Sequence, residues 1–190
     1  MDRDKTVQNV TRMQIQTKIW IKDALLELLK TYNFNEITIK QIVLTAGISR
    51  PTFYRLYKSK NETLKETIND IWYKYSQSVH NLDPKSYKQL LLYAFEYFGK
   101  NHDDLKILID SDLSSYLSKS ATSIFIKEIS DNPAIWREWQ SPLEKTIGVQ
   151  LGFGGMINVL FNWISTDCRT PEDKMVSEIM KVLQSLAKEN

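Results

Sequence analysis

The side chains best able to do chemistry lie in one short segment, residues 36–60. Lys40, Arg50, Arg55 and Lys60 carry positive charge there, and Arg50 stands within the sequence Ser-Arg-Pro-Thr. A guanidinium can donate a fork of hydrogen bonds to paired acceptors such as O6 and N7 of guanine, and an ammonium pairs with phosphate oxygens. The segment therefore has the chemistry of a nucleic-acid reader.

Two short helices joined by a tight turn must position these groups. Thr38, with Gln41 three residues later, forms the capping-box pattern that starts a helix. Gly47 can take the positive φ that a sharp turn requires. Ser49 is the expected N-cap of the second helix, and Pro51 lies in its first turn, where a missing N–H costs nothing. This pattern predicts a helix-turn-helix, whose second helix enters the major groove of DNA.

The position of each residue along the second helix indicates what it contacts. Arg50 lies in the exposed first turn and can reach a base edge, whereas Tyr54 and Arg55 follow one turn later, where the phosphate backbone passes. Taken singly, each cation is more often a solvated surface charge than a DNA contact, so the prediction rests on the combination of caps, turn, proline and cations. The predicted DNA-binding residues are Thr38, Lys40, Ser49, Arg50, Pro51, Thr52, Tyr54, Arg55 and Lys60.

The charge distribution supports a polyanion partner at one end of the chain. The 190 residues carry a net charge of only +2. Residues 1–60 hold eleven Lys and Arg against five Asp and Glu, whereas residues 61–190 hold fourteen against eighteen. A basic first third on an acidic remainder is typical of a nucleic-acid-binding protein, although a chance imbalance of solvated side chains gives the same pattern as often.

Other classes of chemistry find little support. Cys168 is the only cysteine, and with the two histidines, His80 and His102, it gives no metal-ligand spacing. We find no nucleophile paired with a base and no phosphate-binding glycine loop, and Asp103-Asp104 is a helix-start signal. We therefore expect neither an enzyme nor a cofactor, and the polar N-terminus, which lacks a signal peptide, favours a cytoplasmic protein.

Helical periodicity runs through the whole chain, and the expected fold is all-α with about nine helices. A three-helix DNA-binding domain would be joined to a helical bundle through its fourth helix, without a flexible linker. Whatever moves the bundle would then tilt the reader. The expected divisions are a loose polar arm at 1–14, a DNA-binding domain at 15–75 with its helix-turn-helix at about 38–57, and a regulatory and dimerisation domain at 76–190.

The uncharged stretch 146–166 is long enough to cross a bilayer. Gln150, Asn158 and Asn162 fall on one helical stripe of it, which a helix facing lipid would not display. We therefore expect a helix packed among others and no membrane contact.

Residues 17–64 resemble the DNA-binding domain of TetR-type transcriptional regulators. The resemblance is carried by the elements Thr38-Ile39-x-x-Ile42, Ala46-Gly47-Ile48-Ser49, Thr52-Phe53-Tyr54, Tyr57 and Ser59-Lys60-x-x-x-Leu64. It implies that Thr38, Thr52, Tyr54 and Lys60 grip the DNA backbone, and that Lys40, Arg50 and Pro51 face the bases.

Residues 86–188 resemble, more weakly, the C-terminal domain of Firmicutes members of this family, including activators of dihydroxyacetone kinase genes. Gly154-Gly155-Met156-Ile157, Asn162-Trp163-Ile164 and Thr170-Pro171-Glu172 carry this likeness. It implies a homodimer through the last two helices and a palindromic operator in double-stranded DNA. The predicted interface residues are Gly152, Phe153, Ile157, Leu160, Phe161, Ile164, Ile179, Leu183 and Leu186.

Aromatic residues are dense between 87 and 139 and favour a pocket for a small, largely apolar effector. The predicted lining residues are Tyr93, Tyr97, Tyr116, Phe125, Trp136 and Trp139, although aromatics at helical spacing are also typical of a plain core. The expected function is a repressor released by that effector. The alternative is a TetR-type regulator or activator controlled by a protein partner.

Overall fold

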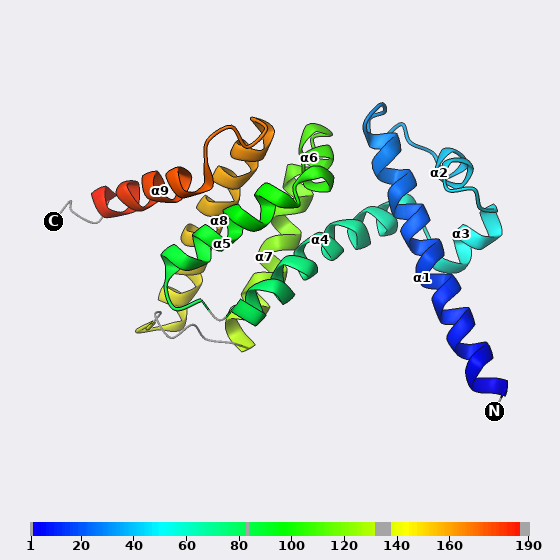
Figure 1. Cartoon of the computed structure of the whole chain (residues 1–190), viewed down its shortest axis with the longest axis horizontal. Coiled ribbons are helices and arrows are strands. Elements are labelled where there is room, and N and C mark those ends of the chain that lie inside the picture. Colours follow the sequence, from blue (N-terminus) through cyan, green and yellow to red (C-terminus); the bar gives the residue numbers. More distant parts are fainter. Residues whose placement is uncertain (1, 83, 132–137, 187–190) are drawn as a thin grey trace. The chain divides into compact units, whose positions relative to one another are not determined.

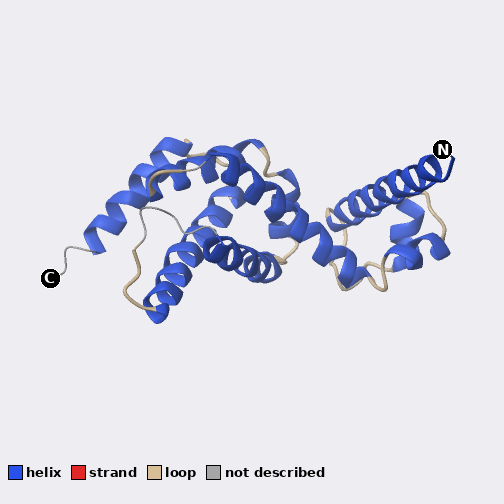
Figure 2. Ribbon diagram, turned by 90° about the horizontal axis from the view of Figure 1, so that it is seen from below, coloured by secondary structure: helices blue, strands red, loops and turns tan. Residues whose placement is uncertain are grey.

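The computed structural model describes residues 2–82, 84–131 and 138–186. Over these residues the chain is all-α, as predicted, and contains no strand (Figure 2). The helices, coloured along the chain in Figure 1, are α1 (Asp2–Leu29), α2 (Ile39–Thr45), α3 (Arg50–Leu56), α4 (Lys60–Leu82), α5 (Tyr87–Lys100), α6 (Asp103–Asp110), α7 (Ser114–Asp131), α8 (Pro142–Ser165) and α9 (Glu172–Leu186).

The chain divides into two compact units, Met1–Ile68 and Asn69–Asn190, and the division falls inside α4. This helix buries a stripe of side chains at spacings of three and four. Leu64 and Ile68 are buried in the first unit, and Trp72 and Tyr75 in the second. One continuous helix therefore contributes to both cores.

In the first unit, α1 packs against α2 and α3 around buried Ile21, Leu25, Ile42 and Phe53. Helix α1 begins at Asp2, so the prediction of a loose arm over residues 1–14 was wrong. This stretch contains neither proline nor glycine, so nothing in its sequence ends the helix before it reaches the N-terminus.

Ion pairs tie α1 to α4 within the first unit. The Glu66 carboxylate accepts hydrogen bonds from Lys18 Nζ at 3.0 and 3.1 Å, and Lys22 Nζ lies 3.2 Å from it. Burial alone would raise the pKa of Glu66, but the two ammonium groups outweigh it and lower the pKa. The Lys18 ammonium also lies 5.4 Å from the ring centre of Tyr57, which connects the same pair to the end of α3.

In the second unit, α5 packs against α8 and α9, while α6 and α7 pack against α8 and each other. Trp163 of α8 is buried, and its indole N–H donates to the carbonyl oxygen of Thr170 at 2.7 Å. Its ring meets that of Phe95 edge-on at 5.1 Å. Helix α8 is thus the central helix of this unit.

Of the described helices, α8 is long and apolar enough to cross a membrane, with a mean hydropathy of 1.3 over its most apolar stretch. That stretch is 39% buried within the chain, and a core helix passes the same test. Gln150, Asn158 and Asn162 are exposed, so the polar stripe predicted from their spacing lies on the outside of the helix.

Candidate nucleic-acid interface

The caps predicted for α2 and α3 are present. The Thr38 hydroxyl accepts from the Gln41 N–H at 3.2 Å, and the Gln41 side chain accepts from the Thr38 N–H at 2.8 Å, which completes the capping box. Gly47 has φ +67° in the turn. The Ser49 hydroxyl accepts from the Thr52 N–H at 3.2 Å. These local bonds fix where α3 begins.

Helix α3 separates an inner from an outer face. Phe53 is fully buried and meets the ring of Tyr54 edge-on at 5.7 Å. The outer face presents Arg50 and Arg55 to solvent, and Tyr54 is 50% exposed. Of the other predicted DNA-binding residues, Thr38, Lys40, Ser49 and Pro51 are exposed, and Thr52 is half-buried beside Ser49. The structure thus presents to solvent the residue types needed to read base edges and hold phosphates.

Lys60 differs from this set, because its ammonium is engaged inside the unit. It donates hydrogen bonds to the carbonyl oxygens of Phe34 at 2.7 Å, Asn35 at 2.9 Å and Ile37 at 2.7 Å. It also lies 4.8 Å from the ring centre of Phe34, and burial lowers the pKa of Lys60. All three ammonium hydrogens are therefore used by the loop before α2, which gives Lys60 a structural role, and its contact with a phosphate stays a prediction. The loop carbonyls lie between helices and need donors, which the sequence does not reveal.

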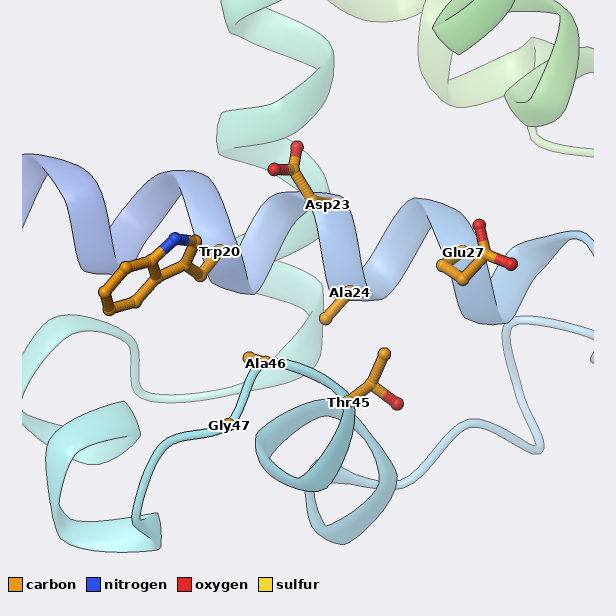
Figure 3. A pocket seen from close by; sticks show the side chains of 7 residues that line it. All are labelled: Trp20, Asp23, Ala24, Glu27, Thr45, Ala46 and Gly47. Atoms are coloured by element: carbon orange, nitrogen blue, oxygen red, sulfur yellow. The ribbon is translucent and has the colours of Figure 1, made fainter.

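A groove of about 430 Å³ lies between α1 and the turn that follows α2 (Figure 3). Asp23 and Glu27 line it together with Trp20, whose ring is 47% exposed. Two carboxylates at its edge would repel a phosphate backbone, so we do not assign this groove to DNA. Its lining residues are Trp20, Asp23, Ala24, Glu27, Thr45, Ala46 and Gly47.

Aromatic rings from α4, α5 and α7 form one cluster in the second unit. Tyr75 lies at its centre, with ring centres 6.2 Å from Tyr93, 5.3 Å from Tyr97, 4.9 Å from Phe98 and 5.6 Å from Phe125. The structure therefore brings together three of the predicted effector residues. We call this group the tyrosine cluster: Tyr75, Tyr93, Tyr97, Phe98 and Phe125.

The remaining predicted effector residues lie elsewhere. Tyr116 is 57% exposed, and Trp139 is half-buried against Gly148. Trp136 falls outside the described residues. Sequence reasoning also missed Tyr75, because the DNA-binding domain was expected to extend to residue 75. Following its buried stripe beyond Ile68 would have found this residue.

Four of the predicted interface residues are buried within the chain itself. Their exposed fractions are 1% for Ile157, 1% for Leu160, 6% for Phe161 and 0% for Ile164. Side chains with almost no surface in one chain cannot contact a second copy, so these assignments were wrong. Apolar residues cover most of the circumference of α8, and the sequence does not show which of them face α5, α6 and α7.

Other apolar side chains of α8 and α9 are exposed. Along α8 they recur every four residues, at Leu143, Ile147 and Leu151, which is 72% exposed. The exposed apolar stripe of these two helices comprises Leu143, Ile147, Leu151, Val159, Val182, Leu183 and Leu186. Leu183 and Leu186 were predicted at the interface. Gly152, Phe153 and Ile179, also predicted there, are half-buried.

Comparison with known proteins supports the architecture described above. Residues 21–67 match the family model described as bacterial regulatory proteins, tetR family. The structure is similar to that of the fatty acid degradation regulator FadR from Bacillus halodurans, with a TM-score of 0.61 and 16% identity over 88% of this chain and 94% of that one. It is also similar to the dihydroxyacetone kinase operon activator DhaS, with a TM-score of 0.58 and 20% identity over 90% and 95% of the two chains. No curated protein sequence matches the chain significantly.

Proposed function

We propose, from the premise that residues 21–67 form the DNA-binding domain of a TetR-type regulator, that this protein is a dimeric repressor of transcription. The observation that carries the proposal is the outer face of α3. It exposes Arg50, Tyr54 and Arg55 on a helix whose start is fixed by Ser49 and whose back is held by buried Phe53. Such a helix suits the major groove.

In this proposal each exposed residue has a separate task. Arg50 donates to a base edge from the first turn of α3, and Lys40 reaches a neighbouring base or phosphate from α2. Tyr54 and Arg55 hold the phosphate backbone, as does the exposed hydroxyl of Thr38. Phosphate contacts supply affinity and salt dependence, and the base contacts supply sequence preference.

A palindromic operator requires a two-fold protein, and the exposed apolar stripe of α8 and α9 supports a dimer. Isolated apolar side chains are common on protein surfaces, but a regular stripe on two helices is typical of an interface. We therefore assign the interface to that stripe, with Leu151 on α8 and Leu186 on α9.

We further propose that a small, largely apolar molecule binds in the second unit and releases the DNA. The tyrosine cluster supports this site, and α4 supports the coupling because it runs uninterrupted from Lys60 to Leu82. An effector that binds one conformation of the dimer better than another lowers operator affinity by that difference. Such a protein works in the cytoplasm, where its operator lies.

The test is operator binding by the purified protein. Fluorescence anisotropy with labelled duplex from upstream of its own gene should show tight, saturable binding, with affinity falling steeply as salt rises from low to physiological concentrations. A duplex of shuffled sequence serves as the control. Equal affinity for both duplexes, or no binding at any salt concentration, would contradict the proposal.

A second candidate is an activator controlled by a protein partner. Its support is the similarity in fold to the dihydroxyacetone kinase operon activator. Deleting the gene and measuring transcripts of its neighbours separates the two candidates. A rise in transcripts supports the repressor, whereas a fall supports the activator.

A further inference from the structure

Tyr75 combines deep burial with an unsatisfied polar atom. Its side chain is 2% exposed, and its hydroxyl has no hydrogen-bond partner among the described residues. Buried hydroxyl groups in folded proteins are nearly always paired, because removing one from water without a partner is unfavourable. This hydroxyl therefore calls for an acceptor.

Two polar side chains of the same unit, Trp72 and Tyr87, do have hydrogen-bond partners. One turn earlier on α4, the indole N–H of Trp72 donates to the carbonyl oxygen of Leu117 at 3.1 Å. At the start of α5, the Tyr87 hydroxyl donates to the carbonyl oxygen of Gly152 at 3.0 Å. The unit thus supplies carbonyl partners for these neighbours but none for Tyr75.

The surroundings of Tyr75 keep its phenol neutral. Burial raises its pKa, and the nearby hydroxyls of Tyr93, Tyr97 and Tyr87 raise it further. The phenol therefore remains a hydrogen-bond donor throughout the physiological pH range. Among the described residues, no lysine or arginine contributes to this shift. A charged ligand group would be buried beside Tyr75 without a counter-charge, which favours a neutral acceptor.

The tyrosine cluster reaches the surface through α5. Tyr93 and Tyr97, four residues apart, are both half-buried, and their ring centres lie 6.2 Å from each other. On the inner side, Phe125 continues the apolar lining to Phe153, with ring centres 4.5 Å apart. Because the tyrosine rings are in contact, a flat molecule would have to displace the ring of Tyr93 or Tyr97, and it would then lie among aromatic side chains beside Tyr75.

We infer that the Tyr75 hydroxyl is the polar anchor of the effector site and selects uncharged aromatic or alicyclic molecules that carry a carbonyl acceptor. This inference rests on the proposed function, because it specifies the ligand class of the proposed effector. The anchor adds direction to a site that is otherwise built mainly of aromatic rings. One precisely placed polar group in an apolar pocket is how such sites gain specificity.

The probe for the test is the naphthyl ketone prodan, whose emission moves to longer wavelength when its carbonyl accepts a hydrogen bond. Full-length wild-type protein should bind prodan, and Tyr75→Phe should weaken binding about three- to tenfold, the usual effect of losing one neutral hydrogen bond. Emission of the bound probe should also move to shorter wavelength in the variant. Tyr73→Phe is the matched control, because Tyr73 lies on the same helix and is 60% exposed.

Two further measurements make the test decisive. The naphthylamine that lacks the ketone should bind wild type and Tyr75→Phe equally. Without probe, the variant should melt at the same temperature as wild type or higher, because it loses only an unpaired hydroxyl. The inference is overturned if prodan does not bind, if its affinity or emission is unchanged in Tyr75→Phe, or if the variant melts lower, since the hydroxyl would then already have a partner.

Operator binding is measured on the same samples, so that the two proposals fail separately. Operator binding by wild type, together with no effect of Tyr75→Phe on prodan, rejects the anchor alone. If Tyr75→Phe weakens prodan binding but the wild-type protein binds no operator, the proposed function as a regulator is rejected. The inferred role of Tyr75 in binding a small molecule then stands on its own.

Discussion

The ammonium of Lys60 donates a hydrogen bond to the carbonyl oxygen of Ile37 at 2.7 Å. Lys60 is the first residue of α4, and Ile37 immediately precedes Thr38, the N-cap of α2. The start of α4 therefore holds the start of α2. This hydrogen bond therefore links the start of α2 to α4, the helix that continues into the second unit.

Replacing Lys60 with methionine should destabilise the first unit. Lys60→Met leaves three loop carbonyls without their donor, and we expect a loss of about 2 kcal/mol in free energy of unfolding. Urea denaturation followed by circular dichroism measures this loss. Lys58→Met, at an exposed neighbouring cation, is the control and should change stability by less than about 0.5 kcal/mol. If Lys60→Met left stability unchanged but flattened the salt dependence of operator binding, the ammonium would belong to the DNA interface after all.

Arg50→Ala should relax sequence preference. Removing a guanidinium that pairs with a guanine costs about 1–3 kcal/mol of discrimination at one base pair. Selection from a randomised duplex library, followed by anisotropy on the selected sequences, locates that base pair. Arg55→Ala is the comparison, because a lost phosphate contact weakens all sequences alike and lowers the salt slope by about one. If Arg50→Ala weakened binding to all DNA sequences equally, Arg50 would contact the DNA backbone rather than a base.

Gly47→Ala should destabilise the turn between α2 and α3 through backbone conformation alone. Gly47 has φ +67°, and an added Cβ would meet nothing within 4 Å. We expect a cost of about 1 kcal/mol, because side-chain-bearing residues disfavour this region. Gly154→Ala is the matched control: it also meets nothing within 4 Å but lies inside α8, where alanine should stabilise by about 0.5–1 kcal/mol. Equal effects of the two substitutions in urea titrations would exclude this explanation.

Glu66→Gln should lower stability at neutral pH and have little effect in acid. The folded protein lowers the pKa of Glu66 below its ordinary value of 4.5, so its ion pairs with Lys18 and Lys22 stabilise fully above that value. Their contribution, about 1 kcal/mol for partly exposed pairs, disappears as pH falls through the folded pKa. Unfolding free energies of wild type and variant should therefore converge below pH 4.5. Glu27→Gln, at an exposed pair with Lys30, should change stability less at every pH.

Leu151→Glu should convert the dimer to a monomer. Leu151 is 72% exposed in the single chain, and a carboxylate in an apolar interface is strongly unfavourable. Sedimentation velocity gives the oligomeric state. Leu44→Glu, at an equally exposed leucine of α2, should leave the dimer intact. If the Leu151→Glu protein remained a dimer, the dimer interface would not include the exposed apolar stripe on α8.

The features predicted correctly from the sequence are those encoded locally. The capping box at Thr38, the cap at Ser49 and the turn at Gly47 each depend on residues within four positions of one another. The features that the sequence did not reveal are mostly contacts between distant residues. Lys60 reaches carbonyls more than twenty positions away, and the burial of Ile157 depends on which side of α8 faces its neighbours. Tyr75 was missed because one helix serves two units.

The division of α3 into a buried and an exposed face has a consequence for evolution. Folding of the first unit depends on its caps, its turn and Phe53, whereas the proposed base contacts, Lys40 and Arg50, are exposed side chains outside the core. Under the proposed assignment, a duplicated copy of the gene can therefore acquire a new operator by changing Lys40 and Arg50 with little risk to folding. Operator preference should thus diverge faster among descendants of this protein than the architecture that displays it.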